Sequence, residues 1–379
     1  MDFSLSAEQQ LLQDTVTQYC KKQYDFESRM ARVASDKVAD RTQWKAFADL
    51  GWLGAGLPEE LGGYGGSVID NSIICEQFGH ALVLEPFISS AVLSCQILAS
   101  LPVSQQTMLL LEKSIAGDTI LATAHSEPAA RGNLQHTETR ATPHKGEWRL
   151  NGKKSLVVGL SIADHVIVSA NTDEGAALFL VDAEAIQSQI KPYRTIDNAL
   201  AGDLCLENTP SSVKLSGPEH TMRALANGFA DALICLCSEA VGAMDTALFL
   251  TRDYLKLRQQ FGSSLNNFQS LQHRMAEMLV ELELSRSIVY HGIASSGMSD
   301  PLRSRAISAM KALVSSAALF VGANAVQLHG AIGMTEEYSI GHYYKRLRVI
   351  SHLYGNEDTH LKILSTTQGS FWDEGVHQH

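Results

Sequence analysis

The stretch YLKLRQQFGSSLNNFQSLQHRMAEM, from Tyr254 to Met278, decides the fold. Gly262 interrupts a helical pattern and Gln269 opens a second one, so the stretch predicts two helices joined by a short connection. The second helix carries one apolar stripe at spacings of four, three and four residues, formed by Leu271, Met275, Met278 and Leu282. A stripe of this kind packs against the core of a helical bundle.

Polar and aromatic groups gather at the junction between these two helices. Arg258, Gln260 and Phe261 stand just before the glycine, and Gln269 follows it. A guanidinium can pair with a diphosphate at two points, and amides can bind ribityl or adenine edges. A solvated helix end with ordinary caps explains the same residues, and their chemistry alone does not decide between the two interpretations.

A second cluster, QLHGAIGMTEE, covers Gln327 to Glu337. Gly330 and Gly333 follow a helical run without charges, and glycines permit a ligand's phosphates to approach the backbone closely. Glycine pairs also end many helices, so this signal is weak on its own.

The pattern of apolar and polar residues changes twice along the chain. Residues 1–118 are helical in pattern, and Ser6 with Gln9 can form a capping box. Residues 119–220 hold short β-rich segments, and Asn151-Gly152 among them predicts a hairpin turn. Residues 221–379 return to the helical period. The predicted domains are therefore 1–118, 119–220 and 221–379.

Composition narrows the function classes. The 379-residue chain has a formal net charge of −11, so it repels phosphate backbones and we expect no nucleic-acid binding. Its six cysteines form no C-x-x-C pair, which predicts buried thiols, no metal site and a reducing compartment. The polar start predicts a cytoplasmic protein. The uncharged run 312–334 is long enough to span a bilayer, but its polar and small residues favour a buried helix and no membrane.

With these motifs in order, the chain resembles the acyl-CoA dehydrogenase family of flavoproteins over nearly its whole length. GWLGAGLPEELGGYGGS resembles the family's PE-x-x-GG-x-G segment, and RQQFG…FQ…Q and QLHG-x-x-G resemble its two best signatures. The resemblance implies a mostly α fold with a central β domain: a helical N-domain, a small β-barrel domain and a C-terminal helical bundle. It also implies FAD, an acyl-CoA substrate, an electron-transfer acceptor, and a dimer or tetramer.

The resemblance also assigns residues to the cofactor. By the family's pattern, the FAD of a neighbouring subunit would be reached by Arg258, Gln260, Phe261, Gln269, Gln327 and Gly330. Ser126 takes the place of a Thr that meets the flavin ring, and Val158 replaces a flavin-contacting Thr. Three departures accompany them: Arg131 replaces a Gly, Gly132 replaces a Ser on the CoA side, and Leu156 replaces the Trp that shields the flavin.

The catalytic base of the family has no counterpart at its usual positions. The family removes an α-hydrogen as a proton to a carboxylate and a β-hydrogen as hydride to the flavin. The usual Glu falls on Tyr354, or on Gly355 if the register slides by one residue. Some members carry the base on an earlier helix, and that position here is Ala232.

Three carboxylates remain as candidates for a displaced base. Asp231 stands beside the second position, although one residue turns a helix by about 100°. Glu357 lies three residues past the usual site and would need a rebuilt turn. Glu239 is expected to be a buried, paired carboxylate.

These departures are similar to the small subunits of the pimeloyl-CoA dehydrogenase type, which pair with a larger relative that carries the base. The leading prediction is therefore one subunit of a heteromeric, FAD-dependent acyl-CoA dehydrogenase. A self-sufficient homomer that uses Asp231 or another displaced base, and a scaffolding subunit without flavin, remain as alternatives.

Overall fold

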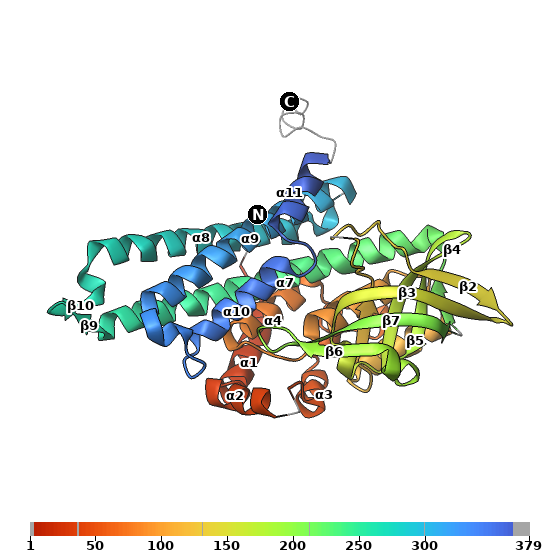
Figure 1. Cartoon of the computed structure of the whole chain (residues 1–379), viewed down its shortest axis with the longest axis horizontal. Helices are drawn as coiled ribbons and strands as arrows, with labels where there is room; N and C mark the ends of the chain where they lie inside the picture. Colours follow the sequence, from red (N-terminus) through yellow and green to blue (C-terminus); the bar gives the residue numbers. More distant parts are fainter. Residues whose placement is uncertain (1–3, 36–37, 131, 212, 299, 367–379) are drawn as a thin grey trace.

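The computed structural model describes residues 4–35, 38–130, 132–211, 213–298 and 300–366, in three consecutive parts (Figure 1). The first part is helical. Its α1 begins with the predicted capping box, in which Ser6 and Gln9 bond each other's backbone, so this prediction is confirmed. The helices are α1 Ala7–Gln23, α2 Phe26–Ala34, α3 Arg41–Asp49, α4 Val68–Ala81, the π-helical turn Ile88–Ser94, α5 Cys95–Ala99 and α6 Gln105–Ile115.

The middle part is an eight-stranded sheet with the order β6-β7-β3-β2-β4-β5-β8, and β1 pairs with β4. Most neighbours are antiparallel, while β4 pairs in parallel with β1 and β2. The strands are β1 Leu121–Ala124, β2 Arg140–His144, β3 Glu147–Val158, β4 His165–Thr172, β5 Gly175–Asp182, β6 Ile190–Arg194, β7 Leu200–Ser211 and β8 Val213–Ser216.

The hairpin turn predicted at Asn151-Gly152 was wrong. Both residues lie inside β3, where the register against β7 shifts. A Cβ on Gly152 would lie 2.5 Å from the Thr139 hydroxyl, so this glycine serves a close approach between neighbouring segments. The turn between β2 and β3 falls instead on Lys145 and Gly146, both of which have positive φ.

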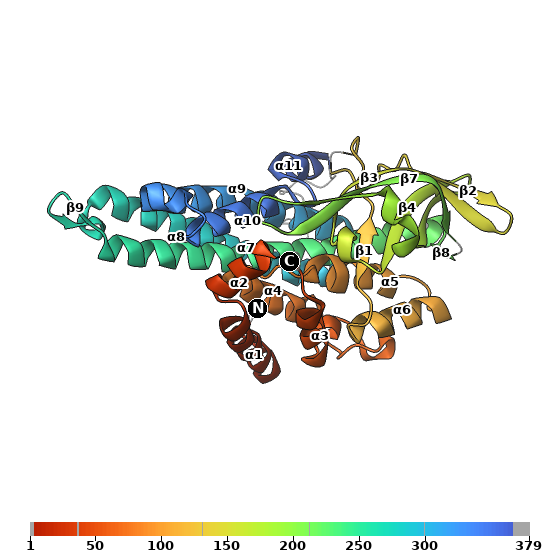
Figure 2. The same cartoon turned by 60° about the horizontal axis from the view of Figure 1, so that its bottom comes forward.

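The last part is a helical bundle built along α7, a helix of 40 residues (Figures 1 and 2). A short hairpin separates α7 from α8, and α9 and α10 then pack back against α7. The elements are α7 Pro218–Leu257, β9 Gln259–Gln260, β10 Ser263–Ser264, α8 Gln269–Ala294, α9 Asp300–His329, α10 Ile340–His352 and α11 Glu357–Thr366.

Two helices, Pro218–Leu257 and Asp300–Met334, are long and apolar enough to cross a membrane by length and composition. Their most apolar windows are 78% and 67% buried inside the fold, respectively, so both act as core helices of a globular bundle. The predicted buried helix at 312–334 lies within the second.

The N-terminal helices join the bundle through a backbone contact between α4 and α7. A Cβ on Gly79 would lie 2.0 Å from the Glu239 carbonyl oxygen, and a Cβ on Gly242 would lie 1.9 Å from the Glu76 carbonyl oxygen. Each helix therefore offers the other a glycine at the crossing, and any side chain there forces the two backbones apart.

We expect Gly242→Ala to lower the free energy of unfolding by about 3 kcal/mol, because the added methyl overpacks a backbone crossing. Chemical denaturation compares the variant with Gly297→Ala, where an added Cβ meets nothing within 4 Å and where we expect less than about 0.5 kcal/mol. Equal midpoints for the two variants would contradict this account of the crossing.

Candidate functional site

A cavity of about 600 Å³, called the cleft below, lies between the middle sheet and the helical bundle. One wall is the 126–134 loop together with the end of β3, and the other is α7 with the turn that joins α10 to α11. Its described lining includes Ser126, Val158, Phe229, Tyr354 and Gly355. The cleft is large enough to hold part of a cofactor and a small reacting group together.

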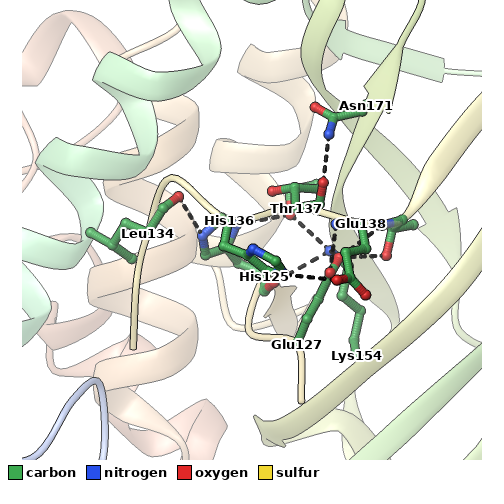
Figure 3. Close-up of polar contacts among 10 residues, drawn as sticks. His125, Glu127, Leu134, His136, Thr137, Glu138, Lys154 and Asn171 are labelled. Atoms are coloured by element: carbon green, nitrogen blue, oxygen red, sulfur yellow. Dashed lines mark hydrogen bonds and ion pairs between the residues drawn. The ribbon is translucent and has the colours of Figure 1, made fainter. Parts of the chain in front are cut away.

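A buried polar network fixes the loop that carries Ser126 (Figure 3). Lys154 Nζ donates to Glu127 Oε1 at 2.7 Å and to Ser169 Oγ at 3.0 Å. His125 Nε2 donates to the Leu134 carbonyl at 3.0 Å, and its Nδ1 meets the same serine at 2.8 Å. The two ends of the loop are thereby tied to β3 and β4, which gives the cleft one rigid wall.

The charges in this network are set by burial. Desolvation lowers the pKa of Lys154 to about 8, although Glu127 opposes the shift. Burial opposes ionisation of Glu127, but hydrogen bonds from Lys154 and Thr139 hold the pKa of that carboxyl below its usual value. Desolvation also lowers the pKa of His125 to about 4, so the ring is neutral near pH 7.

Possible metal ligands adjoin the same network. Ligand atoms of Glu127, His136 and Glu138 lie within 4.8 Å of one another. The Glu127 oxygens already accept from Lys154, from the Glu138 amide and from both donors of Thr139. Because the Glu127 carboxylate already accepts these hydrogen bonds within the fold, we interpret Glu127, His136 and Glu138 as residues that hold the loop in place.

The opposite wall is a strained turn. Tyr354 has φ +59°, a left-handed conformation that is uncommon for a bulky residue, and Gly355 follows with φ +104°. His360 Nε2 donates to the Tyr354 carbonyl at 3.1 Å, and Asn356 Oδ1 caps α11 by accepting from the Thr359 amide at 3.0 Å. The turn is thus held in its unusual shape by the helix that follows it.

The Tyr354 ring lies at the inner end of the cleft and packs edge-on against Phe229, with ring centroids 5.4 Å apart. Burial raises the pKa of Tyr354 above its usual value. The group is therefore a neutral phenol near pH 7 and can donate a hydrogen bond, but it does not accept a proton as a carboxylate does.

The cleft brings together six of the positions predicted to lie at the flavin, the CoA or the base: Ser126, Gly132, Leu156, Val158, Tyr354 and Gly355. Ala232 packs in the same apolar cluster as Tyr354, while Asp231 is absent from the described lining of the cleft. Arg131 lies outside the described residues.

The other predicted cofactor residues lie at the far end of the bundle (Figure 1). Arg258, Gln260 and Phe261 belong to the β9–β10 hairpin and its approach, and Phe261 is 90% exposed. Phe229, which lines the cleft, lies on α7, and this helix ends next to the hairpin. The 29 helical residues from Phe229 to Leu257 rise roughly 1.5 Å each, so the cleft and the hairpin lie about 40 Å apart. Side chains of the hairpin therefore do not reach the cleft of their own chain.

The end of α9 joins the same remote region. Tyr254, near the end of α7, stacks on His329 with ring centroids 4.4 Å apart. Gln327 and Gly330 are exposed beside that contact, and a Cβ on Gly330 would meet nothing within 4 Å. Gln269, at the start of α8, is also exposed. We call this set of exposed residues around the hairpin the arm.

Sequence reasoning missed a charged cluster behind Tyr354. Arg346, from α10, donates from Nε and Nη2 to the two oxygens of Glu239, both at 2.6 Å, and from Nη1 to Asp197 Oδ2 at 2.8 Å. Glu239 had been expected to be buried and paired, and that expectation is confirmed. Its partners lie far away in the sequence, so no local spacing signals them.

These residues fit FAD as two half-sites. The cleft offers an enclosed pocket that suits a ring system, and the arm offers a cation, amides and open backbone that suit a diphosphate and adenine. Because about 40 Å of helix separates the halves, one cofactor contacts both only where the arm of one chain meets the cleft of another.

The family models agree with this architecture. The chain matches "Acyl-CoA dehydrogenase, N-terminal domain" over residues 6–118, "middle domain" over 122–209 and "C-terminal domain" over 220–368. A curated relative is "Acyl-CoA dehydrogenase IpdE2" of Mycobacterium tuberculosis, 27% identical over 369 residues, which are 97% of this chain and 98% of that protein.

Solved structures share the fold. A variant of the "Tcur3481-Tcur3483 steroid ACAD" is 28% identical with a TM-score of 0.85, covering 94% of this chain and 96% of that one. The ChsE4-ChsE5 complex from Mycobacterium tuberculosis gives a TM-score of 0.87 at 21% identity over 97% and 100% of the two chains. A glutaryl-CoA dehydrogenase of Mycobacterium smegmatis in complex with FADH2 gives 0.86 at 23% identity over 97% and 96%.

Three domain matches that together cover most of the chain, and a fold shared with solved structures over nearly its whole length, lead to one conclusion: the chain belongs to the acyl-CoA dehydrogenase family.

Proposed function

We propose that the chain is one subunit of a heteromeric, FAD-dependent acyl-CoA dehydrogenase, and that its own cleft lacks the catalytic base. The observation that carries the proposal is the neutral phenol of Tyr354 at the inner end of the cleft, where the family places a carboxylate. The partner subunit would supply the base, and this chain would supply its arm to the partner's cofactor.

Removal of an acyl-CoA α-proton needs a group with a pKa matched to working pH, placed against the thioester. FAD, when bound, supplies the acceptor for the β-hydride. Protein donors and a dry pocket acidify the α-position. In this chain, Ser126 and the loop network form one wall of the cleft, and Tyr354 forms part of the other. The cleft can therefore still bind and orient an acyl-CoA, but it has no base that could abstract the α-proton.

Other carboxylates near the cleft do not replace the base. Both oxygens of Glu239 accept from Arg346, and Glu357 is not among the described lining residues. Asp358 is the one carboxylate in the described lining of the cleft, and it lies in the first turn of α11. This observation favours a second candidate function, a self-sufficient homomer in which Asp358 is the displaced base.

Assembly follows from the surface of α8. Leu279, Val280 and Leu284 are 45%, 54% and 49% exposed on this one helix, which is an apolar excess for a surface that faces only water. Since α8 begins next to the arm, a second subunit that covers it also receives the arm. We propose a cytoplasmic dimer or tetramer with a larger dehydrogenase chain. The resemblance to the pimeloyl-CoA dehydrogenase type stays a prediction, because relatives that are 27% identical to this chain do not single out that type.

Asp231 is a half-buried carboxyl whose ionisation is opposed by desolvation. Desolvation raises its pKa from 3.8 to about 6, and Arg303 opposes the shift only in part. A folded-state pKa above the unfolded value means that folding favours the protonated form. The residue therefore lowers stability as the pH rises from about 4 to about 6, and its cost is complete above that window.

We expect Asp231→Asn to leave turnover of the purified assembly within about 3-fold of the wild type, because the side chain does not line the cleft. The free energy of unfolding should rise at pH 7.5 by on the order of 2 kcal/mol, and this gain should vanish towards pH 4. A loss of about 100-fold in turnover with FAD retained would instead identify Asp231 as the base.

We expect Arg258→Ala to weaken FAD binding by the assembly at least about 10-fold, because a charge-assisted pair to the diphosphate is lost. Fluorescence titration of FAD measures the affinity. Arg252→Ala is the matched control, since it removes an exposed arginine from the same helix, two turns earlier. Unchanged affinity in Arg258→Ala would remove the arm from the cofactor site.

We expect the isolated, FAD-loaded chain to leave its flavin band unbleached when it is mixed anaerobically with a panel of acyl-CoAs. Tyr354→Glu should bleach the band at least about 100 times faster than the wild type, because it restores a carboxylate at the inner end of the cleft. Tyr354→Gln, which has the same shape without a base, should stay inactive.

The wild type itself decides between the two candidate functions. Rapid bleaching by the homomer with release of an enoyl-CoA, abolished by Asp358→Asn, would refute the heteromeric subunit and establish the self-sufficient enzyme.

A further inference from the structure

A second cavity of about 50 Å³, the tail chamber, adjoins the cleft behind Tyr354. The two cavities share Ser89, Leu156, Val158, Leu353 and Tyr354 in their walls. A ligand group that passes the Tyr354 ring therefore enters the chamber, and the chamber has room for only a few heavy atoms. An acyl group whose thioester sat in the cleft could extend its far part into the chamber through this shared wall.

The walls of the tail chamber combine an apolar lining with charges. Phe78, Val83 and Val349 supply apolar surface, while Arg346, Glu239 and Glu85 also line it. A pocket built only for a hydrocarbon end would not keep three ionisable side chains at its wall, because each loses hydration there. The chamber is therefore suited to a group that forms hydrogen bonds.

Arg346 has hydrogen-bond donors that its two carboxylate partners do not use. A guanidinium carries five N–H groups. Three of them bond Glu239 and Asp197, so two have no acceptor within the described part of the chain. Burial alone would lower the pKa of Arg346, but the two carboxylates raise it, so the group stays charged. With its side chain 16% exposed, Arg346 can offer these donors to an oxygen in the chamber.

The charges around Arg346 already balance. Glu239 and Asp197 offset Arg346 and Arg29, and the Arg29 guanidinium donates to the Asp197 carbonyl at 3.0 Å. Glu85 adds a further carboxyl to the wall and lies 3.7 Å from Arg32. A carboxylate brought into the chamber would face Glu239 without a new counter-charge, since Arg346 is already paired. A neutral oxygen meets the donors without that repulsion.

We propose that the tail chamber is a subsite for a neutral oxygen function, a ketone or a hydroxyl, on the acyl group, and that Arg346 determines this specificity. The proposal rests on the proposed function, because the acyl-CoA class comes from it. Arg346 donates to the oxygen, and Glu239, whose charge is already offset by Arg346, rejects an acyl group that ends in a carboxylate.

Titration calorimetry of the full chain with three acyl-CoAs of equal chain length tests the proposal. One thioester ends in a methyl group, one carries a ketone next to that end, and one ends in a carboxylate. We expect the keto compound to bind at least about 10-fold more tightly than either of the others, because a charged donor meets an otherwise unpaired oxygen.

Two variants separate the subsite from general stability. Val349→Met fills the chamber from α10 without touching a charge, and Val103→Met makes the same change at a site that is 74% exposed. The keto preference should fall below about 3-fold in the first and stay unchanged in the second.

The outcomes distinguish this inference from the proposed function. Equal affinity for the keto and methyl compounds would overturn the subsite alone, and tighter binding of the carboxylate compound would overturn its charge argument. Failure to bind any of the three would overturn the subsite together with the acyl-CoA ligand. Turnover by the isolated chain with the keto preference intact would overturn the heteromeric function and leave the subsite standing.

Discussion

A buried arginine, a half-buried arginine and two buried carboxylates join the three parts of the chain. Arg29 comes from α2, Asp197 from the loop between β6 and β7, Glu239 from α7 and Arg346 from α10. Removing one member of such a cluster typically costs about 3–5 kcal/mol, because it leaves an uncompensated buried charge. Together with the α4–α7 crossing, this cluster fixes the relative placement of the three domains and therefore contributes to the width of the cleft between them.

The same cluster forms the wall of the tail chamber, so the domain junction and the proposed specificity use the same atoms. Arg346 satisfies its structural partners with three N–H groups and keeps two for the chamber. Planar guanidinium geometry makes this division possible, since its donors point along fixed and different directions. A lysine at this position could hold one carboxylate but would not present a fixed edge to a ligand.

How much of this could be predicted from the sequence depends on the range of each interaction. The Ser6 capping box is confirmed because caps act over three residues. The hairpin turn predicted at Asn151-Gly152 was wrong, because this glycine is explained by a tertiary contact with Thr139 and not by a local turn. The prediction that Tyr354 stands at the usual Glu position came from a motif, whereas the pairing of Arg346 with Glu239 joins residues 107 positions apart, and no spacing rule reaches so far.

Under the proposed function, the separation of arm and cleft explains how a chain without the base can still contribute to an active assembly. Arg258, which we propose contacts FAD, lies about 40 Å along α7 from Phe229, and Phe229 packs against Tyr354. Replacing the carboxylate at the turn therefore leaves the arm unchanged. In a homomer every cleft would lose the base at once, and turnover would stop. In an assembly with a chain that keeps the base, the cleft completed by this arm still turns over, and the cleft of this chain is free to serve binding.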